Sequence, residues 1–465
     1  MKEAVEYLSH PEEAYQHCGA SYICHKTFTD DKAKEQVLKL KGILPLVALL
    51  RSPSVQVNQA ASAALRSLSF KDNGNKQEIH RCSGVTEAAT LLRDTDSAEV
   101  QKQLTGLLWN LSSLDTLKPD LLKIALPVLM ERVILPYTNG CDQTETEAEA
   151  FFHATGCVRN LSSSKQSYRQ GMRKCRGLID SLVKYIDECV QAEKPDHKSV
   201  QNCVCTLHNL TFQLEAEASA LFSRMASLGQ AVTRSDSQDG AGPIGCFSPQ
   251  SKLPVQKQNF DFPDIEESQP SGAALLIHSK TLRCYLSLLN SSQQEETQEA
   301  CCGVLQNLTT NKGIVSAVMS QVIVQKLNGL QVLGPLLQSN KVNLQRNAMA
   351  LIGNLAKNPN LHSAIARKGL PEALNVLSAG TKEGNESDDT LALACQAAAR
   401  VIAGEPEITK QLLNKSSCCV IIIVFSFSRY LPKSKKATAL LLYNLWSDKE
   451  LQSFLKKQGM SKSSF

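Results

Sequence analysis

The sequence predicts an all-α protein, built as a right-handed superhelical solenoid of about nine stacked helical repeats with a long insert between repeats five and six. The first observation is a short segment, Leu104–Ser113, that returns in degraded form along nearly the whole chain. Each clear copy holds an asparagine in register, at Asn110, Asn160, Asn209, Asn307, Asn354 and Asn444. The second observation is the length, because 465 residues are more than one compact core usually spans.

The spacing of the copies, once insertions are allowed for, fits a period of about 40–47 residues, which is typical of armadillo and HEAT repeats. Within each copy the apolar residues recur with helical periodicity. In the first segment they are Leu104, Leu107, Leu108 and Leu111. These side chains share one side of a helix that turns about 100° per residue. We therefore expect this helix to bury the same apolar stripe in every repeat.

The asparagine lies on another face of that helix, together with the residues one, four and eight positions before it. Because this face repeats, we expect stacked units to form a continuous groove. A buried asparagine is normally retained only when it is hydrogen-bonded. The asparagine ladder therefore braces the superhelix or grips the backbone of an extended peptide, and both can hold together. Ser67 and Arg400 replace the asparagine in two weaker copies, where we expect the ladder to be broken.

Three regions follow along the chain. We expect residues 1–216 to hold repeats one to five, residues 217–272 to form a partly disordered insert, and residues 273–465 to hold repeats six to nine. The first repeat is divergent in the manner of a cap, with a helix around Ala14–Phe28. We expect Thr138–Glu149 to be an acidic loop. Later repeats open at a glycine that suits a tight corner between helices, at Gly42, Gly84, Gly177, Gly329 and Gly369.

Composition limits the function. The net charge of +5 does not by itself indicate nucleic-acid binding. No run of about 18 apolar residues is present, so we expect no transmembrane segment, and the charged N-terminus does not resemble a signal peptide. Of the 16 cysteines, Cys157, Cys203 and Cys301 fall on the apolar stripe, where a free thiol acts as a small hydrophobe. We therefore expect a reducing compartment.

No catalytic constellation is recognisable, so we expect a protein that is not an enzyme and has no cofactor or metal site. The run Gly240–Gly245 matches a dinucleotide fingerprint by letters alone, because no strand precedes it and Pro243 would break the helix that should follow. His153 and His208 lack an acidic or cysteine partner at ligand spacing, and we expect them to be structural or solvated.

The asparagine face is the candidate binding site. At one and eight positions before the asparagine, the six clear copies and the weaker copy at Ser67 hold five basic residues and one acidic residue, and no acid stands there in repeats two to five. The face is either merely solvated or a groove that attracts an acidic extended segment. The candidate groove residues are Arg66, Lys102, Trp109, Asn110, Arg159, Asn160, His208 and Asn209.

A second basic cluster lies in the link before the fifth repeat. It consists of Lys165, Arg169, Arg173, Lys174 and Arg176. It either contacts phosphates or anionic lipid, or is a solvated connector.

The position four residues before the asparagine is small in most copies, as the sequence has Ala63, Gly106, Gly156, Cys205, Gly303 and Ala350 there. Armadillo-type nuclear-import adaptors carry tryptophan at this position, where it clamps lysine side chains. Its absence argues against a receptor for basic localisation signals.

Several longer segments resemble the armadillo domain of the plakophilins, in the delta-catenin group of the armadillo superfamily, and most nearly the type 1 plakophilins. These segments are 101–113, 151–163, 177–186, 202–217 and 244–252. The resemblance covers essentially the whole chain, including the place of the long insert. It implies nine repeats and a bend made by that insert.

The resemblance also implies a non-enzymatic scaffold of the desmosomal plaque, at the cytoplasmic face of cell junctions, in the cytoplasm and also in the nucleus. Its implied partners are desmosomal cadherin tails, desmoplakin, plakoglobin and keratin intermediate filaments. Related delta-catenins hold an acidic cadherin segment in the basic groove of their first repeats. The matching positions here include Arg66, Lys102, Trp109 and Arg159. Plakophilins also carry a long N-terminal head that is not part of this sequence, so we expect either that the sequence is a fragment or that the role of the head is absent.

The alternative function is binding of RNA or of RNA-associated proteins, which the family also suggests. It would need basic groups interleaved with aromatic rings for base stacking. Trp109 and Phe152 are few for that purpose.

Overall fold

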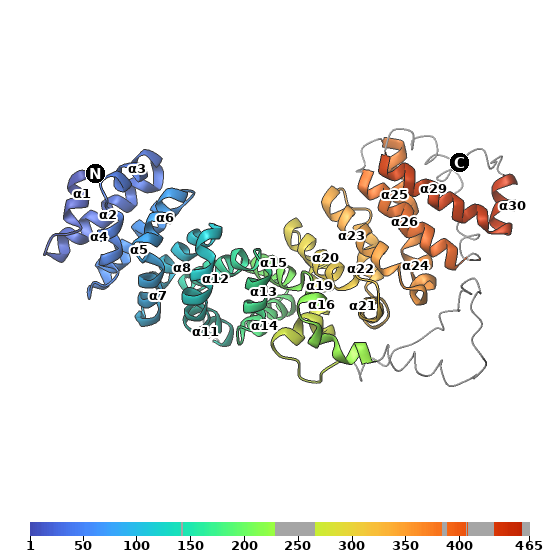
Figure 1. Ribbon diagram of the computed structural model, residues 1–465, viewed down its shortest axis with the longest axis horizontal. Coiled ribbons are helices and arrows are strands. Elements are labelled where there is room, and N and C mark those ends of the chain that lie inside the picture. Colours follow the sequence, from blue (N-terminus) through green and yellow to red (C-terminus); the bar gives the residue numbers. More distant parts are fainter. Residues whose placement is uncertain (141–142, 228–265, 384–387, 406, 408–431, 458–465) are drawn as a thin grey trace, which may run out of the picture. The chain divides into compact units, whose positions relative to one another are not determined.

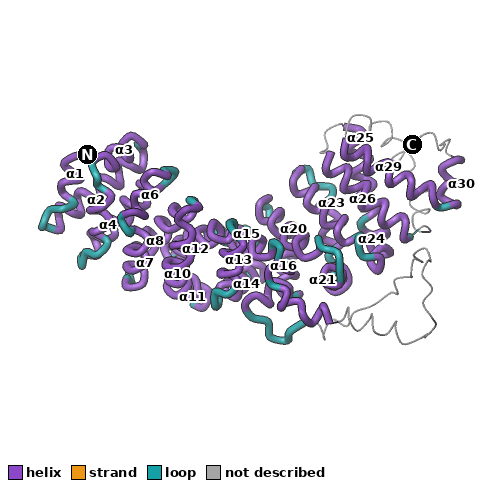
Figure 2. Tube along the Cα trace, in the orientation of Figure 1, coloured by secondary structure: helices purple, strands orange, loops and turns teal. Residues whose placement is uncertain are grey.

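The computed structural model of the chain describes residues 1–140, 143–227, 266–383, 388–405, 407 and 432–457. Within these ranges every regular element is a helix (Figures 1 and 2), which confirms the predicted all-α solenoid. Contacts divide the chain into two units, each described by itself. Unit 1 comprises Met1–Leu210 with Ser271–Leu276, and unit 2 comprises Thr211–Pro270 with Ile277–Phe465. The predicted boundaries at residues 216 and 272 stay predictions.

Unit 1 consists of helices joined by short turns. Its elements are α1 (Lys2–Tyr7), α2 (Glu13–Thr29), α3 (Asp31–Lys39), α4 (Ile43–Leu49), α5 (Val55–Ser69), α6 (Asn73–Arg81), α7 (Gly84–Asp94), α8 (Ala98–Ser112), η1 (Asp115–Leu117), α9 (Lys118–Asp120), η2 (Leu121–Ala125), α10 (Leu126–Leu129), η3 (Met130–Ile134), α11 (Leu135–Asn139), α12 (Glu145–Ser162), α13 (Gln166–Arg173), α14 (Leu178–Gln191) and α15 (Val200–Thr211).

Unit 2 repeats the same plan. Its described elements are α16 (Leu214–Glu217), η4 (Ser219–Phe222), η5 (Gly272–Ile277, mostly within unit 1), α19 (Ser279–Ser291), α20 (Glu295–Thr309), α21 (Ile314–Gln321), η6 (Val322–Lys326), α22 (Leu330–Leu336), α23 (Val342–Leu355), η7 (Pro359–Leu361), α24 (His362–Lys368), α25 (Leu370–Glu383), α26 (Asp388–Gly404), α29 (Pro432–Ser447) and α30 (Lys449–Lys457).

The helices that carry the asparagine position, here called the ladder helices, pack side by side. In unit 1 they are α5, α8, α12 and α15, with α2 packed against α5; in unit 2 they are α20, α23, α26 and α29 (Figure 1). The predicted apolar stripe is confirmed, because Leu104, Leu107, Leu108 and Leu111 have no exposed surface. Burying a leucine side chain stabilises a fold by about 1.5–3 kcal/mol, so the stripe supplies much of the stability of each repeat.

The free thiols of Cys157, Cys203 and Cys301 are buried on the same stripe, as predicted. Burial raises the pKa of Cys157 to about 12, which keeps this thiol protonated and unreactive.

The predicted glycine corners are present as well. At Gly84, the first residue of α7, a Cβ atom would lie 2.4 Å from Cγ2 of Ile79. No larger residue fits there without moving the preceding helix, so the corner requires glycine.

The stretch from η1 to α11 is one continuous helical run that contains π turns. Pro127 and Pro136 follow closely on η2 and η3. Proline has no N–H to donate to the preceding turn, and widened π turns are a usual response to such an interruption.

The predicted acidic loop is shorter than expected. Thr138 belongs to α11, and α12 begins at Glu145. Thr144 caps α12 through a capping box with Glu147, a sequence signal that marks a helix start and not a loop. The helix predicted around Ala14–Phe28 is α2. The run Gly240–Gly245 and most of the predicted insert lie outside the described residues.

Candidate partner-binding groove

The ladder asparagines brace successive repeats. In unit 1, Nδ2 of Asn110 donates to the carbonyl oxygen of Arg66 at 2.9 Å, and Nδ2 of Asn160 donates to Oγ of Ser112 at 3.0 Å. Nδ2 of Asn209 likewise donates to Oγ of Ser162 at 2.9 Å. Each bond therefore ties one ladder helix to the last turn of the preceding one. This is the bracing role, while a grip on a peptide remains a prediction.

The two expected breaks in the ladder do not occur. Oγ1 of Thr27 donates to Oγ of Ser67 at 2.9 Å, so the serine still joins α5 to α2. Nη1 of Arg400 donates to the carbonyl oxygen of Gly353 at 3.0 Å, which joins α26 to α23. The prediction was wrong because the position needs a hydrogen bond across the repeat interface, and other polar side chains can supply it.

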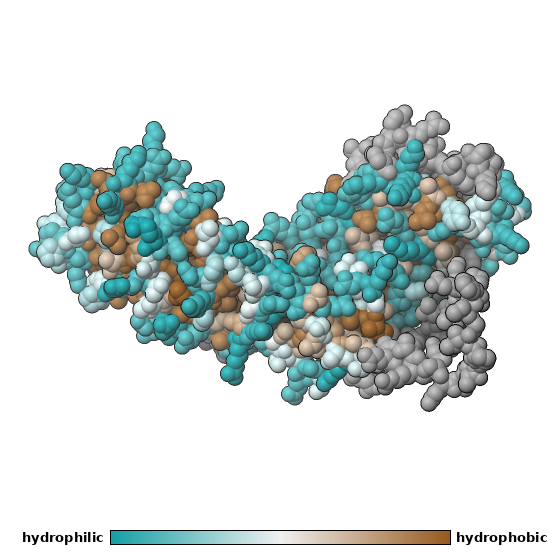
Figure 3. All heavy atoms as spheres, in the orientation of Figure 1, coloured by the Kyte–Doolittle hydropathy of each residue, from teal (hydrophilic) through white to brown (hydrophobic). Residues whose placement is uncertain are grey.

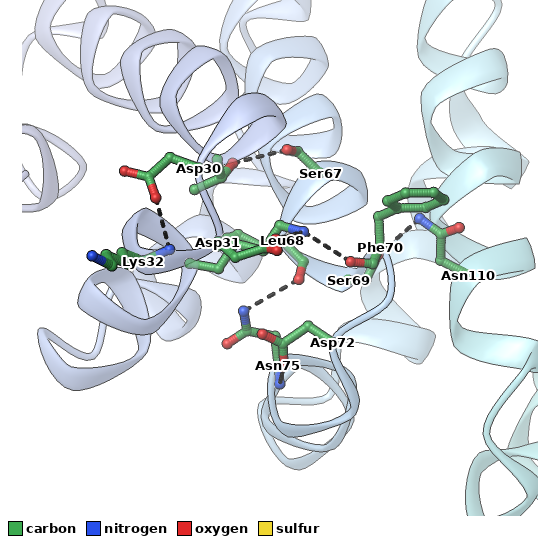
Figure 4. A network of polar contacts seen from close by, with 12 residues as sticks. Asp30, Asp31, Lys32, Ser67, Leu68, Ser69, Phe70, Asp72, Asn75 and Asn110 are labelled. Carbon is green, nitrogen blue, oxygen red and sulfur yellow. Dashed lines mark hydrogen bonds and ion pairs between the residues drawn. The ribbon is translucent and has the colours of Figure 1, made fainter.

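At the C-terminal end of α5, neighbouring helices supply hydrogen-bond donors to the carbonyl groups (Figure 4). The last carbonyl groups of a helix have no partner within it. Asn75 of α6 donates to the carbonyl oxygen of Leu68 at 3.2 Å, and Nζ of Lys34 of α3 donates to that of Phe70 at 2.9 Å. Asn110 reaches the same end from α8, where its Nδ2 also contacts Oγ of Ser69 at 3.2 Å.

Arg66 is not a free groove charge. Its guanidinium group packs over Gly106 of α8, with Nη1 donating to Oε1 of Gln103 at 3.2 Å. Nη2 lies 3.1 Å from Nε2 of His153, a buried residue of α12. Burial lowers the pKa of Arg66, yet arginine keeps its charge in proteins. The group is therefore a half-buried cation that joins three ladder helices.

His153 contacts residues of both preceding ladder helices. Its Nδ1 lies 3.1 Å from the carbonyl oxygen of Lys102, while its Nε2 faces the Arg66 donor. These partners are satisfied together by a neutral ring that donates from Nδ1 and accepts at Nε2. Burial, with the Arg66 charge second, lowers the pKa of His153 to about 4. The prediction of a structural role for His153 agrees with this geometry, whereas its contact with Arg66 was not foreseen.

Trp109 of α8 rests on a glycine of α12, in the same way that Arg66 of α5 rests on Gly106 of α8. A Cβ atom at Gly156 would lie 2.4 Å from Cε2 of the indole, so the ring rests on that glycine. The indole and the Phe152 ring pack edge to face, with ring centroids 5.2 Å apart. Nζ of Lys198 lies 5.7 Å from the centroid of Phe152, within range of a cation–π interaction. The small residues before the asparagine therefore seat the large side chain of the preceding repeat.

The electrostatic prediction for this part of the groove needs correction. Nζ of Lys102 lies 2.7 Å from Oε2 of Glu99 and 3.7 Å from Oε2 of Glu149. Both carboxylates stand on the groove side at a helical position that the charge count omitted. The Lys102 ammonium, about a fifth exposed, is thus partly neutralised.

The remaining candidate residues lie on the last two ladder helices of unit 1. Arg159, Asn160, His208 and Asn209 are all half-buried on α12 and α15, and burial lowers the pKa of His208. All eight candidates therefore lie on the ladder helices α5, α8, α12 and α15, while their shared role in binding stays a prediction.

A hollow of about 440 Å³ extends this face toward the N-terminus. It lies between α2 and α5 and includes Cys24, Phe28, Gln59 and Ala63. Phe28 is 81% exposed. Hydrophobic residues reach the surface among these first helices (Figure 3), so the groove here offers apolar as well as polar contacts.

The second basic cluster is not a surface patch. Arg169 and Arg173 lie on α13 and are only 8% and 6% exposed. Nε of Arg173 donates to the carbonyl oxygen of Leu210 at 2.8 Å, and Nη1 of Arg169 donates to that of Ser164 at 2.8 Å. Arg169 and Arg173 are therefore structural charges of a helix, whereas Lys165 and Lys174 cap that helix and Arg176 lies in the turn that follows it. Only Lys165, Lys174 and Arg176 are exposed.

A repeated buried cation was missed by the sequence reasoning. Lys34, Lys76, Lys118 and Arg169 occupy the same place in the short helices that follow α2, α5, α8 and α12, and all are buried. Nζ of Lys34 pairs with Asp31 at 2.9 Å, and Nζ of Lys118 pairs with Asp115 at 2.7 Å. The recurring spacing of a polar residue and a base three positions later was the signal that could have found them.

Comparisons with known proteins agree with this architecture. Residues 30–70 and 269–310 match the Armadillo/beta-catenin-like repeat family. A solved structure from a study of the interaction between cadherin and beta-catenin superposes with a TM-score of 0.58 at 14% identity, covering 95% of this chain and 77% of that one. At such identity the likeness concerns the fold alone. No helix of the described ranges is both long and apolar enough to cross a membrane.

Closer relatives are named plakophilins and catenins. Plakophilin-2 of Mus musculus is 37% identical over 96% of this chain, which spans 57% of that protein. Plakophilin-3 of Bos taurus is 31% identical over 100% of this chain, which spans 60% of it. Catenin delta-2 of Homo sapiens is 30% identical over 100% of this chain, which spans 40% of it. The predicted likeness to type 1 stays a prediction. The repeats of this chain belong to the plakophilin armadillo domains.

Proposed function

We propose that this domain is a non-enzymatic adhesion scaffold of cell junctions that receives an extended, acidic partner segment in the groove of unit 1. The observation that carries the proposal is the shared face of α5, α8 and α12, where Arg66 rests on Gly106 and Trp109 rests on Gly156. Fixed side chains of this kind lose little conformational entropy when a partner binds. The plakophilin relationship supports the adhesive role.

The partners expected from that relationship are desmosomal cadherin tails, desmoplakin, plakoglobin and keratin filaments. The site of action is then the cytoplasmic face of the desmosome, with cytoplasmic and nuclear pools. Because the chain spans only 40–60% of the length of these relatives, a partner that needs the remaining length would not bind this domain alone.

The preference for acidic segments rests on Lys102, Arg159 and Lys198, with Glu99 and Glu149 as the opposing charges. A carboxylate of the partner would replace Glu149, the more distant partner of Lys102. Since such contacts are partly exposed, we expect binding to weaken as salt is raised.

The test is binding of the cytoplasmic tail of a desmosomal cadherin at physiological salt, measured by calorimetry. Lys102→Glu combined with Lys198→Glu should weaken binding about tenfold or more, because two favourable charges become repulsive. Arg66 is left intact, since its half-buried contacts would confuse loss of binding with loss of folding.

Lys123→Glu is the matched control, because Lys123 is exposed and lies on η2, which is not a ladder helix. A folded wild-type chain that does not bind, or a double variant that binds as the control does, would refute the groove as the site. Single-stranded RNA is added as a competitor. Displacement of the tail by RNA at comparable concentration would favour the alternative function in RNA binding.

A further inference from the structure

We propose that unit 2 carries a second docking site, on α23, α26 and α29, for an extended peptide that alternates acidic and apolar residues. A hollow of about 840 Å³ lies on the ladder face of these three helices. Its size is that of a ligand site, and it is larger than the hollow in unit 1. Nothing in the proposed function of unit 1 depends on it.

Besides the polar residues Asn347, Gln396 and Asn444, the hollow is lined by an apolar set that is here called its floor. It includes Ala350, Leu393, Ala437 and Leu440. Leu440 is 50% exposed, and the adjoining Tyr443 is 69% exposed. In the other clear repeats the position of Leu440 holds a smaller residue, so this leucine is a distinctive contact. Exposed apolar side chains grouped in a concave site favour an apolar ligand group.

The rim of the hollow is basic. Four cations, Arg346, Arg400, Lys433 and Lys436, stand against one carboxylate, Asp389. Lys433 is already paired with Asp389 at 2.6 Å, and Arg346 is close enough to Glu299 to affect its titration.

Arg400 and Lys436 differ from the other two cations, because no carboxylate of the described ranges forms an ion pair with either. Burial alone lowers the pKa of Arg400, with no acidic neighbour to offset it. The Arg400 charge also helps to lower the pKa of Lys357, after burial. A half-buried cation beside other cations gains most from a carboxylate supplied by a ligand.

These features select the ligand. In an extended peptide, successive side chains point to opposite sides, so apolar side chains can enter the floor while acidic ones reach the rim. A purely acidic segment would leave Leu393 and Leu440 in water, and a basic one would meet Arg400 and Lys436. Charge complementarity and the apolar floor therefore both favour an extended peptide that alternates acidic and apolar residues.

The probe is a fluorescent peptide of alternating aspartate and leucine, about eight residues long, which spans the hollow when extended. Binding to the 465-residue chain is measured by anisotropy. Arg400→Asn combined with Lys436→Gln should weaken binding about tenfold or more. Arg400→Asn introduces the residue that other ladder helices carry, so the bond across the repeat interface is retained. Circular dichroism checks that the variant is folded.

Lys435→Gln is the matched control, because Lys435 is exposed beside Lys436 but does not line the hollow. The control, and the double variant of Lys102 and Lys198 in unit 1, should bind the probe as the wild type does. An aspartate–glycine peptide should bind less tightly, and a lysine–leucine peptide should not bind.

Three results would overturn the proposal. One is a folded wild-type chain that does not bind the aspartate–leucine probe, and another is equal binding by the double variant or by the aspartate–glycine peptide. The third is a wild-type dimer in light scattering that becomes monomeric in the double variant, which would make the hollow a contact between two copies of the chain.

Discussion

The guanidinium group of Arg66 lies directly over Gly106, so that a Cβ atom at residue 106 would come within 2.5 Å of Arg66 Nε. Trp109 and Gly156 have the same relationship one repeat later. In both pairs a glycine makes room for the large side chain of the preceding ladder helix. The shape of the groove therefore depends on residues that themselves make no polar contact.

Gly106→Ala tests this relationship. Alanine would gain helix propensity but push Arg66 out of its place, and overpacking usually costs about 1–3 kcal/mol. Gly171→Ala is the control, because Gly171 lies in α13 with nothing near its Cβ position. Relative to that control, urea unfolding should find Gly106→Ala less stable by about 1–3 kcal/mol. Equal stability of the two variants would mean that Arg66 moves aside freely.

The ladder gives a second prediction, at Arg400. Arg400→Ala removes the donor to the carbonyl oxygen of Gly353 and should cost about 1 kcal/mol. Arg400→Asn should stay within about 0.5 kcal/mol of the wild type, because Asn444 makes the same kind of bond to the carbonyl oxygen of Ala399 at 3.1 Å. Thermal unfolding of both variants measures the difference. A loss in Arg400→Asn as large as in Arg400→Ala would show that the arginine length is essential.

Arg173 and Lys174 give the third prediction, because they are adjacent in the sequence but differ in burial. Arg173→Ala leaves the carbonyl oxygen of Leu210 without this donor and should cost about 1–3 kcal/mol. Lys174→Ala should change stability by less than about 0.5 kcal/mol. If binding to anionic vesicles fell only in Arg173→Ala while its stability was unchanged, the structural role would be refuted.

The fourth prediction concerns pH. The pKa of His153 is lowered to about 4 in the folded protein, against about 6.5 in the unfolded chain. The unfolded state therefore binds more protons between these two values, so this contribution to stability is complete above about pH 6.5 and is lost as the pH falls toward 4. His153→Gln keeps a donor and an acceptor but does not titrate.

Between pH 7 and pH 4, the wild type should lose about 2–3 kcal/mol more stability than His153→Gln. Urea unfolding at several pH values measures this. Because the carboxylates titrate in both proteins, their contribution cancels when the stability loss of His153→Gln is subtracted from that of the wild type. Parallel pH profiles for the two proteins would show that His153 is not held neutral by burial and Arg66.

The sequence was sufficient for the parts of the fold that depend on local periodicity. The stripe of Leu104, Leu107, Leu108 and Leu111 follows from the helical repeat alone, and so does the shared face of Asn110 and Trp109. Predicting these features requires only the assignment of one helix and the direction in which each of its residues points. Periodicity therefore predicted which residues are buried and which face the groove.

Contacts between helices could not be predicted in this way. Arg66 and His153 are 87 positions apart in the chain, and no sequence period joins them. Glu149 stands eleven positions before Asn160, so its contact with Lys102 of the preceding ladder helix does not follow from the positions one and eight before the asparagine. The charges of Arg169 and Arg173 predict a solvated link, whereas their spacing with Met172 fits the buried side of a helix.

The hydrogen bond between Arg66 and His153 has a consequence for how the solenoid unfolds. It joins α5 to α12 across α8, so it links repeats that are not adjacent. Solenoid stability is usually treated as a sum of single-repeat and nearest-neighbour terms. Here a term beyond nearest neighbours couples three consecutive repeats into one cooperative block, and a chain shortened to end before α12 would weaken α5 as well as the helix beside the cut.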